Sequence, residues 1–96
     1  MTEYRYCLHG EIDLADAQQL RSDLQQAINT ERAHLLIDCT SLTFIGSTGV
    51  TVLLEANQKL EADGRHMLIV NVQPGPRRVF DALGLTDLLR YEREPA

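Results

Sequence analysis

One segment of this 96-residue chain, residues 38–49, is rich in side chains that could bind a partner or take part in a reaction. The segment combines an acid with several hydroxyl groups, two glycines and an apolar pair, Phe44 and Ile45. A serine at the start of a helix can cap the helix, accept a phosphate or act as a nucleophile. Ser47 and Thr48 stand just before a stretch with helical apolar spacing. These three chemistries are therefore the ones to weigh.

A hydrolase site is not supported by the spacing around Ser47. A nucleophile elbow requires Gly-x-Ser-x-Gly, but Ile45 stands where the first glycine belongs. His9, His34 and His66 supply the residue type of a base, and we expect them at strand ends or in loops. The HExxH, Walker and Gly-x-Gly-x-x-Gly motifs are all missing. We expect no enzyme activity, no cofactor and no metal, while nucleotide binding stays an open alternative.

The charge balance of the chain is acidic. Fourteen acids against nine bases give a formal net charge of -5, and no basic cluster exceeds Arg77-Arg78. Phosphate backbones and anionic membranes are therefore poor partners, and we expect no nucleic acid. The apolar runs are far shorter than the roughly 20 residues that cross a bilayer. We expect a cytoplasmic protein without membrane insertion, made of one domain over residues 1–96.

The two cysteines, Cys7 and Cys39, lie 32 positions apart in apolar stretches and form no CxxC motif. Without a signal for an oxidising compartment, reduced and buried thiols are expected. A disulfide or redox pair between them is the lesser alternative, since neighbouring strands would bring them close.

Strand and helix patterns alternate along the chain. Period-2 or continuous apolar runs predict strands at 4–9, 35–38, 67–70 and 88–91. Apolar steps of three and four predict helices at 13–29, from Ser47 or Thr48 to 63, and around 76–83. Asp13 is the expected N-cap of the first helix, and Ser47 or Thr48 of the second. Gly10 interrupts the first strand, while Gly64 and Gly84 end helices.

This alternation predicts an α/β fold with parallel strands joined by right-handed crossovers. Such sheets carry their functional loops at the carboxyl ends of the strands. Residues 10–13 and residues 38–49 both follow a strand and lead into a helix. We therefore expect these two loops to lie side by side.

The chain resembles the STAS domains, and among them the bacterial anti-sigma factor antagonists. The resemblance rests on residues 8–13, similar to the family's Gly-Glu-hydrophobic-Asp turn, on the strand that ends at Asp38, and on Ser47-Thr48-Gly49 at the expected spacing. Gly84-Leu85 after the third helix also fits. It implies a mixed sheet of about four strands with a largely parallel core and about three to four helices. We expect the N-terminal strand and C-terminal helix of typical members to be shortened in this chain.

The resemblance implies partner switching. An unphosphorylated antagonist binds an anti-sigma factor that is also a serine kinase, which releases a sigma factor; phosphorylation reverses this binding and a serine phosphatase resets it. Ser47 occupies the position of the phosphorylated serine, with Thr48 a weaker candidate. Gly46 stands where the family commonly has an Asp. The implied partner-binding residues are Asp13, Asp38, Thr40, Phe44, Ile45, Gly46, Thr48 and Gly49.

A second interpretation assigns Ser47 to helix capping alone. The protein would then be a constitutive STAS subunit, resembling those of lipid-transport or stressosome-like assemblies. Asp38 is expected to organise its loop through amides at the start of the second helix, and to contact a partner second. Phe44 and Ile45 are expected as a tucked apolar anchor whose edge a partner could use. The shortened ends leave a sheet edge that a homodimer or another partner could cover.

Overall fold

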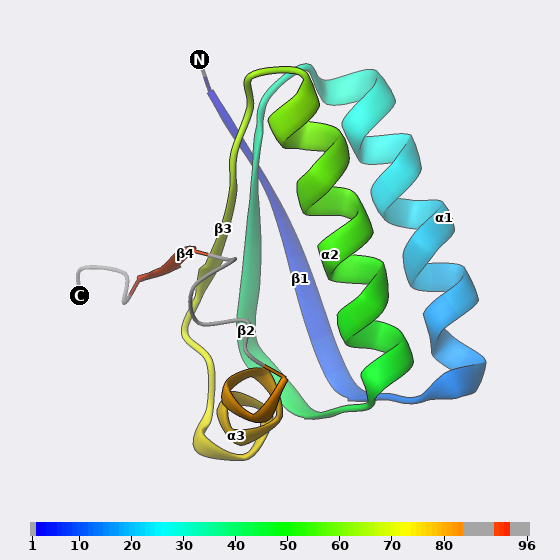
Figure 1. Cartoon of the computed structure of the whole chain (residues 1–96), viewed down its shortest axis with the longest axis vertical. Helices are drawn as coiled ribbons and strands as arrows, with labels where there is room; N and C mark the ends of the chain where they lie inside the picture. The colour runs from blue at the N-terminus through cyan, green and yellow to red at the C-terminus, as the bar shows by residue number, and fades with distance from the viewer. Residues whose placement is uncertain (1, 84–89, 93–96) are drawn as a thin grey trace.

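The computed structural model describes residues 2–83 and 90–92. Strands and helices alternate along this part of the chain (Figure 1). The strands are β1 (Glu3–Ile12), β2 (His34–Ile45), β3 (Met67–Val70) and the three-residue β4 (Arg90–Glu92). The helices are α1 (Leu14–Glu31), α2 (Ser47–Ala62) and α3 (Pro74–Ala82).

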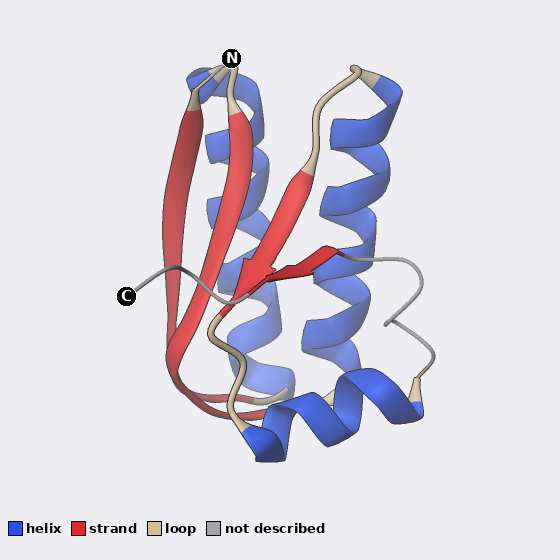
Figure 2. Cartoon of the chain, turned by 90° about the vertical axis from the view of Figure 1, so that its left-hand side faces the viewer, coloured by secondary structure: helices blue, strands red, loops and turns tan. Residues whose placement is uncertain are grey.

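The sheet has the order β1-β2-β3-β4, and each neighbouring pair of strands runs parallel. The expected mixed sheet is therefore corrected to a parallel one within the described residues. Helices α1 and α2 cover the same face of the sheet, and α3 lies across the end where β1 and β2 finish (Figures 1 and 2). Strands β1 to β3 carry the layer beneath the helices, and β4 is a short addition at the β3 edge.

The main core lies between the sheet and helices α1 and α2. Apolar side chains repeat at helical spacing along both helices, so each helix turns one apolar stripe inward. Residues of β1, β2 and β3 meet these stripes from the sheet. The largest fully buried members are Leu8, Leu24, Ile37, Leu42, Ile45, Val50, Leu53, Leu60, Met67, Ile69 and Phe80.

Strands β1 and β2 are longer than expected. β1 continues through Gly10, whose φ of +61° is accommodated where the pairing with β2 changes register. β2 continues past Asp38 as far as Ile45, still paired with β1. The expected loop at residues 38–49 is thus mostly strand, with a single residue, Gly46, between β2 and α2.

The helix ends confirm one predicted cap and correct another. Asp13 is the N-cap of α1, and its carboxylate accepts from the amides of Ala15 and Asp16 while the Asp16 carboxylate accepts from the Asp13 amide. This reciprocal pair is a capping box. The N-cap of α2 is Gly46, not Ser47 or Thr48, and no side chain caps that helix.

The C-terminal elements match the prediction in part. Helix α3 begins at Pro74, earlier than expected, and keeps Pro76 in its first turn. It ends with Leu83 as C-cap. The described part of the last strand is Arg90–Glu92 rather than 88–91. The predicted stop at Gly84-Leu85, and Leu88 and Leu89, lie outside the described residues.

Candidate functional site at the start of helix α2

The turns that lead into α1 and α2 lie side by side. Ile12 and Ile45 are register partners at the ends of β1 and β2, and the Gly46 amide donates to the Ile12 carbonyl at 2.9 Å. Asp13 directly follows Ile12, and Ser47 directly follows Gly46. The structure thus joins the two segments that follow β1 and β2, as the parallel topology predicts.

Ser47 is the first residue of α2, and its side chain is exposed. The hydroxyl makes no capping hydrogen bond, whereas the Ser47 carbonyl accepts from the Thr51 hydroxyl at 3.0 Å. No acidic residue stands in the first turn of α2. The positive end of the helix dipole is therefore not offset by a carboxylate of its own helix. Thr48, one position further on, is half-buried.

The backbone conformation at position 46 does not require a glycine. Its φ of -85° and ψ of 171° are ordinary N-cap values that most residues adopt. A Cβ atom added there would meet the Ile12 carbonyl oxygen and a Phe44 ring carbon, both at 3.8 Å. These are normal contact distances, so an aspartate fits at this position.

Three apolar positions of the predicted binding set separate into exposed and buried ones. Phe44 is 44% exposed, and its ring lies near Gly46. Ile45 is fully buried, and Gly49 is buried where α2 crosses Ile45 and Ile12. The expectation that Ile45 and Gly49 contact a partner directly is therefore corrected: both hold α2 against the strand ends.

Asp38 lies seven positions before Ile45, the last residue of β2, which places it about 20 Å along the strand from the turn that leads to Ser47. The Thr40 hydroxyl and amide donate to its carboxylate at 2.7 and 3.0 Å, and Asn71 does so at 3.5 Å. Arg5 on β1 forms an ion pair with it. The expected donors, the amides that begin α2, are thus replaced by groups from β1, β2 and the turn after β3.

These contacts lower the pKa of Asp38 below its ordinary value, chiefly through the Thr40 hydroxyl and then through the Thr40 amide, Asn71 and Arg5, against an opposing effect of burial. The carboxylate therefore stays charged and holds its donors together. Thr40 is exposed, and its carbonyl accepts from the Gln73 side-chain amide just before α3. Asp38 and Thr40 therefore hold the start of α3 against β2. They do not position Ser47.

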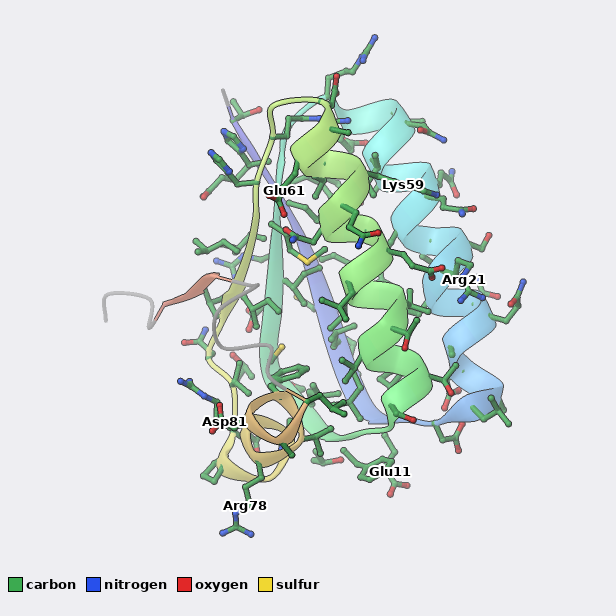
Figure 3. All side chains as sticks on the ribbon, viewed as in Figure 1. Glu11, Arg21, Lys59, Glu61, Arg78 and Asp81 are labelled. Carbon is green, nitrogen blue, oxygen red and sulfur yellow. The ribbon has the colours of Figure 1, made fainter. Side chains whose placement is uncertain are left out.

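Asp13 is fully exposed beside the α2 start, unlike Asp38. Hydrogen bonding to Asp16, through its side chain and its backbone amide, lowers the pKa of Asp13 below its ordinary value. The adjacent Glu11 is also exposed and is the register partner of Phe44. Figure 3 shows Glu11 projecting at the end of the molecule where α2 begins. The turn that neighbours the Ser47 turn therefore carries exposed carboxylates.

The cysteines and histidines do not join this site. Cys7 is exposed rather than buried, whereas Cys39 is buried in the core, and burial raises the pKa of its thiol to about 12. Both thiols are free. His34 and His66 stack with ring centroids 4.9 Å apart at the start of β2, the opposite end of that strand from Ser47.

Comparison with known proteins decides the family. The STAS domain model matches residues 5–95. The chain belongs to the STAS domain family. The parallel sheet and the three helices of the described residues agree with the α/β fold expected of a STAS domain. Among its described residues, this STAS domain has no helix both long and apolar enough to span a bilayer.

Two relatives of this STAS domain are named anti-sigma F factor antagonists. The protein from Lysinibacillus sphaericus is 32% identical over 79 residues, which cover 81% of this chain and 68% of that protein. The protein from Paenibacillus polymyxa is 27% identical over 89 residues, which cover 91% and 76%. A solved structure of the Bacillus cell fate determinant SpoIIAA in its phosphorylated form matches with a TM-score of 0.75 at 26% identity, covering 97% of this chain and 83% of that one.

The sequence patterns missed two partners of Asp38 and one partner of Thr40 in this STAS domain. Arg5, Asn71 and Gln73 approach residues 38–40 from β1 and from the turn after β3, each 33 positions away in sequence. The residue type of Asn71 could have indicated a tight turn after β3, since its φ of +60° is a conformation that Asn tolerates better than most residues. The sequence around Arg5 does not indicate its contact with Asp38, because pairing between strands is not encoded in local spacing.

Proposed function

We propose that this STAS domain is an anti-sigma factor antagonist switched by phosphorylation of Ser47. In its unphosphorylated form it binds an anti-sigma factor with serine kinase activity and so releases a sigma factor. The names of the relatives from Lysinibacillus sphaericus and Paenibacillus polymyxa support the class of protein. The observation that carries the proposal is the exposed Ser47 hydroxyl, which is not engaged in capping α2.

An uncapped helix start favours Ser47 as a phosphate acceptor. The first amides of a helix have no partner within the helix, and the dipole attracts anions to them. Because Gly46 supplies no capping oxygen, these amides are open to the transferred phosphoryl group. The capping-only interpretation of Ser47, which favoured a constitutive subunit, loses its basis because Gly46 is the N-cap.

Phosphorylation of Ser47 would weaken binding without unfolding the domain. A phosphate adds about -1.5 to -2 charges near neutral pH, and a helix N-terminus accommodates such a charge. In the unphosphorylated form a carboxylate of the partner could occupy the same amides. The phosphate takes that position, repels the partner's carboxylate and blocks close approach.

The exposed part of the predicted binding set forms the proposed interface. It consists of Asp13, Phe44 and the hydroxyl of Ser47, with the half-buried residues Gly46 and Thr48 at its margin. Asp38 and Thr40 are proposed to act indirectly, by holding α3 in place at the same end of the sheet. A serine phosphatase would reset the cycle, and both partners would act in the cytoplasm, where transcription takes place.

The binding test compares two substitutions of Ser47 against the purified anti-sigma kinase of the source organism. Ser47→Ala removes the hydroxyl and keeps the surface neutral, so its dissociation constant should stay within about threefold of wild type. Ser47→Asp adds a charge at the helix start and should weaken binding at least tenfold. Equal affinities for the two variants would contradict the switch. Loss of a hydrolytic turnover in Ser47→Ala would instead identify an enzyme.

A further inference from the structure

Leu14 is the most exposed of the large apolar side chains in the described part of the chain, at 76%. It is the first residue of α1 and directly follows the cap Asp13. Capping and the helical pattern account for Asp13 and for the inward stripe, but neither accounts for a leucine at this outward position. A single exposed leucine is common, so its meaning depends on its neighbours.

A second exposed apolar side chain, Phe44, lies at the same end of the sheet. The Phe44 ring is near Gly46. The Gly46 amide donates to the carbonyl of Ile12, and Ile12 stands two residues before Leu14 in the chain. Asp13 stands between Ile12 and Leu14. Leu14 and Phe44 therefore belong to the two neighbouring turns, Leu14 following the Asp13 turn and Phe44 preceding the Ser47 turn.

The formal charges within the two chain stretches that carry these side chains are all negative. No Lys or Arg occurs between Arg5 and Arg21 or between Arg32 and Lys59, the two stretches that build both turns. Three exposed carboxylates, Glu11, Asp13 and Asp16, belong to the first stretch. We call these three residues the acidic rim.

Basic charge at this end of the sheet comes from α3. Arg77 is paired with Asp81, and Arg78 points away from the helix into solvent (Figure 3). The apolar side chains Leu14 and Phe44 are therefore bordered by acids on the α1 side. A complementary surface has apolar positions flanked by Lys or Arg.

We infer that Leu14 extends the proposed interface beyond Phe44, and that these two side chains receive an apolar segment of the anti-sigma factor flanked by basic side chains. This inference rests on the proposed function. Ser47 and the open amides of α2 set whether the partner binds, while Leu14 supplies binding energy that does not depend on the phosphate. The acidic rim steers the basic segment toward the site.

Leu14 and the acidic rim should affect different properties of binding. Burying an exposed leucine in an apolar pocket lowers the dissociation rate, and its removal is typical of a binding hot spot. Removing a rim carboxylate lowers the association rate and the dependence of binding on salt. These two effects can be measured separately in one set of variants.

The experiment measures dissociation constants and association rates for the full chain against the purified anti-sigma kinase, at low and high salt. Leu14→Ala should weaken binding about tenfold with the salt dependence unchanged. Glu11→Gln should slow association and flatten the salt dependence. The control is Tyr4→Ser, because Tyr4 is 36% exposed on β1, far from the α2 start, and should bind like wild type. Thermal melting shows that each variant remains folded.

Two results would overturn the inference. One is wild-type affinity for Leu14→Ala while Ser47→Asp still binds weakly, which would leave the proposed function standing. The other is a wild-type dimer in sedimentation that Leu14→Lys converts to a monomer with undiminished kinase binding, since the surface would then join two copies of this chain. Loss of the Ser47→Asp effect would instead defeat the proposed function itself.

Discussion

Two glycines three residues apart have different tasks in this STAS domain. Gly49 lies where α2 touches the ends of β1 and β2, and an added Cβ would come within 2.9 Å of Ile45 and 3.0 Å of Ile12. Gly46 has room for a side chain and an ordinary backbone. Gly49 therefore sets the position of the Ser47 backbone by packing, whereas Gly46 leaves the amides next to Ser47 open.

Gly49→Ala should destabilise the fold. The new methyl group is too close to two buried isoleucines, and overpacking of this kind costs about 1–3 kcal/mol in the free energy of unfolding. The measurement is the urea midpoint at neutral pH. An alanine variant as stable as wild type would show that α2 can shift away from the strands without cost.

The matched control for this prediction is Gly46→Asp. An aspartate at the N-cap of α2 accepts hydrogen bonds from the free amides, and its negative charge interacts favourably with the positive end of the helix dipole. It should therefore raise the free energy of unfolding by about 0.5 kcal/mol. A loss of stability in this variant would mean that the site does not accept a side chain, contrary to the distances around Gly46.

At the scale of the elements, β2 explains why residues 38–46 resemble a loop in sequence. Between Cys7 and His9, β1 advances two residues while β2 advances three, from Asp38 to Ser41. A second extra residue enters β2 opposite Gly10 and Glu11. The buried positions Cys39, Leu42 and Ile45 consequently recur every third residue instead of every second.

Local spacing therefore predicts part of the fold and misses another part. The cap of α1 and the apolar stripes of α1 and α2 follow from neighbours within a few positions, and the structure confirms them. The extra residues in β2 break the period of two that identifies a strand. The pairing of Arg5 with Asp38 depends on the register of two strands, which local spacing does not encode.

Asp38→Asn tests the contact between β1, β2 and the start of α3. The pKa of Asp38 is lowered in the folded state, so its charge stabilises the fold above the ordinary carboxyl pKa of about 3.9 and this contribution is lost as the pH falls through the folded value. We expect the variant to be less stable by about 1–3 kcal/mol at neutral pH. The difference should shrink as the pH falls below about 4.

The measurement is urea unfolding of both proteins across this pH range. Asp81→Asn on α3 is the control, because its pair with Arg77 is exposed and should contribute less than about 1 kcal/mol. A stability difference between wild type and Asp38→Asn that is independent of pH would show that Asp38 contributes through shape rather than charge.

At the scale of the whole molecule, the proposed functional site lies at one end of a parallel sheet. The carboxyl ends of β1 and β2 bring together Asp13, Phe44 and Ser47, and α3 crosses the same end (Figure 2). This placement follows from the topology, which the sequence predicts through its alternating elements. The division between residues that face solvent and those that hold the core required the structure. Phe44 and Ile45 are neighbouring large apolar residues, yet Phe44 is exposed and Ile45 is fully buried.

The most direct test of the account is the intact mass of the chain after incubation with the purified anti-sigma kinase of the source organism and ATP. Wild type should gain the mass of one phosphate, and Ser47→Ala should gain none. Thr48→Ala should still be phosphorylated, since the exposed hydroxyl belongs to Ser47 and Thr48 is half-buried. A wild-type chain that gains no phosphate, or a Ser47→Ala chain that still gains one, would contradict the central claim that Ser47 is the switch.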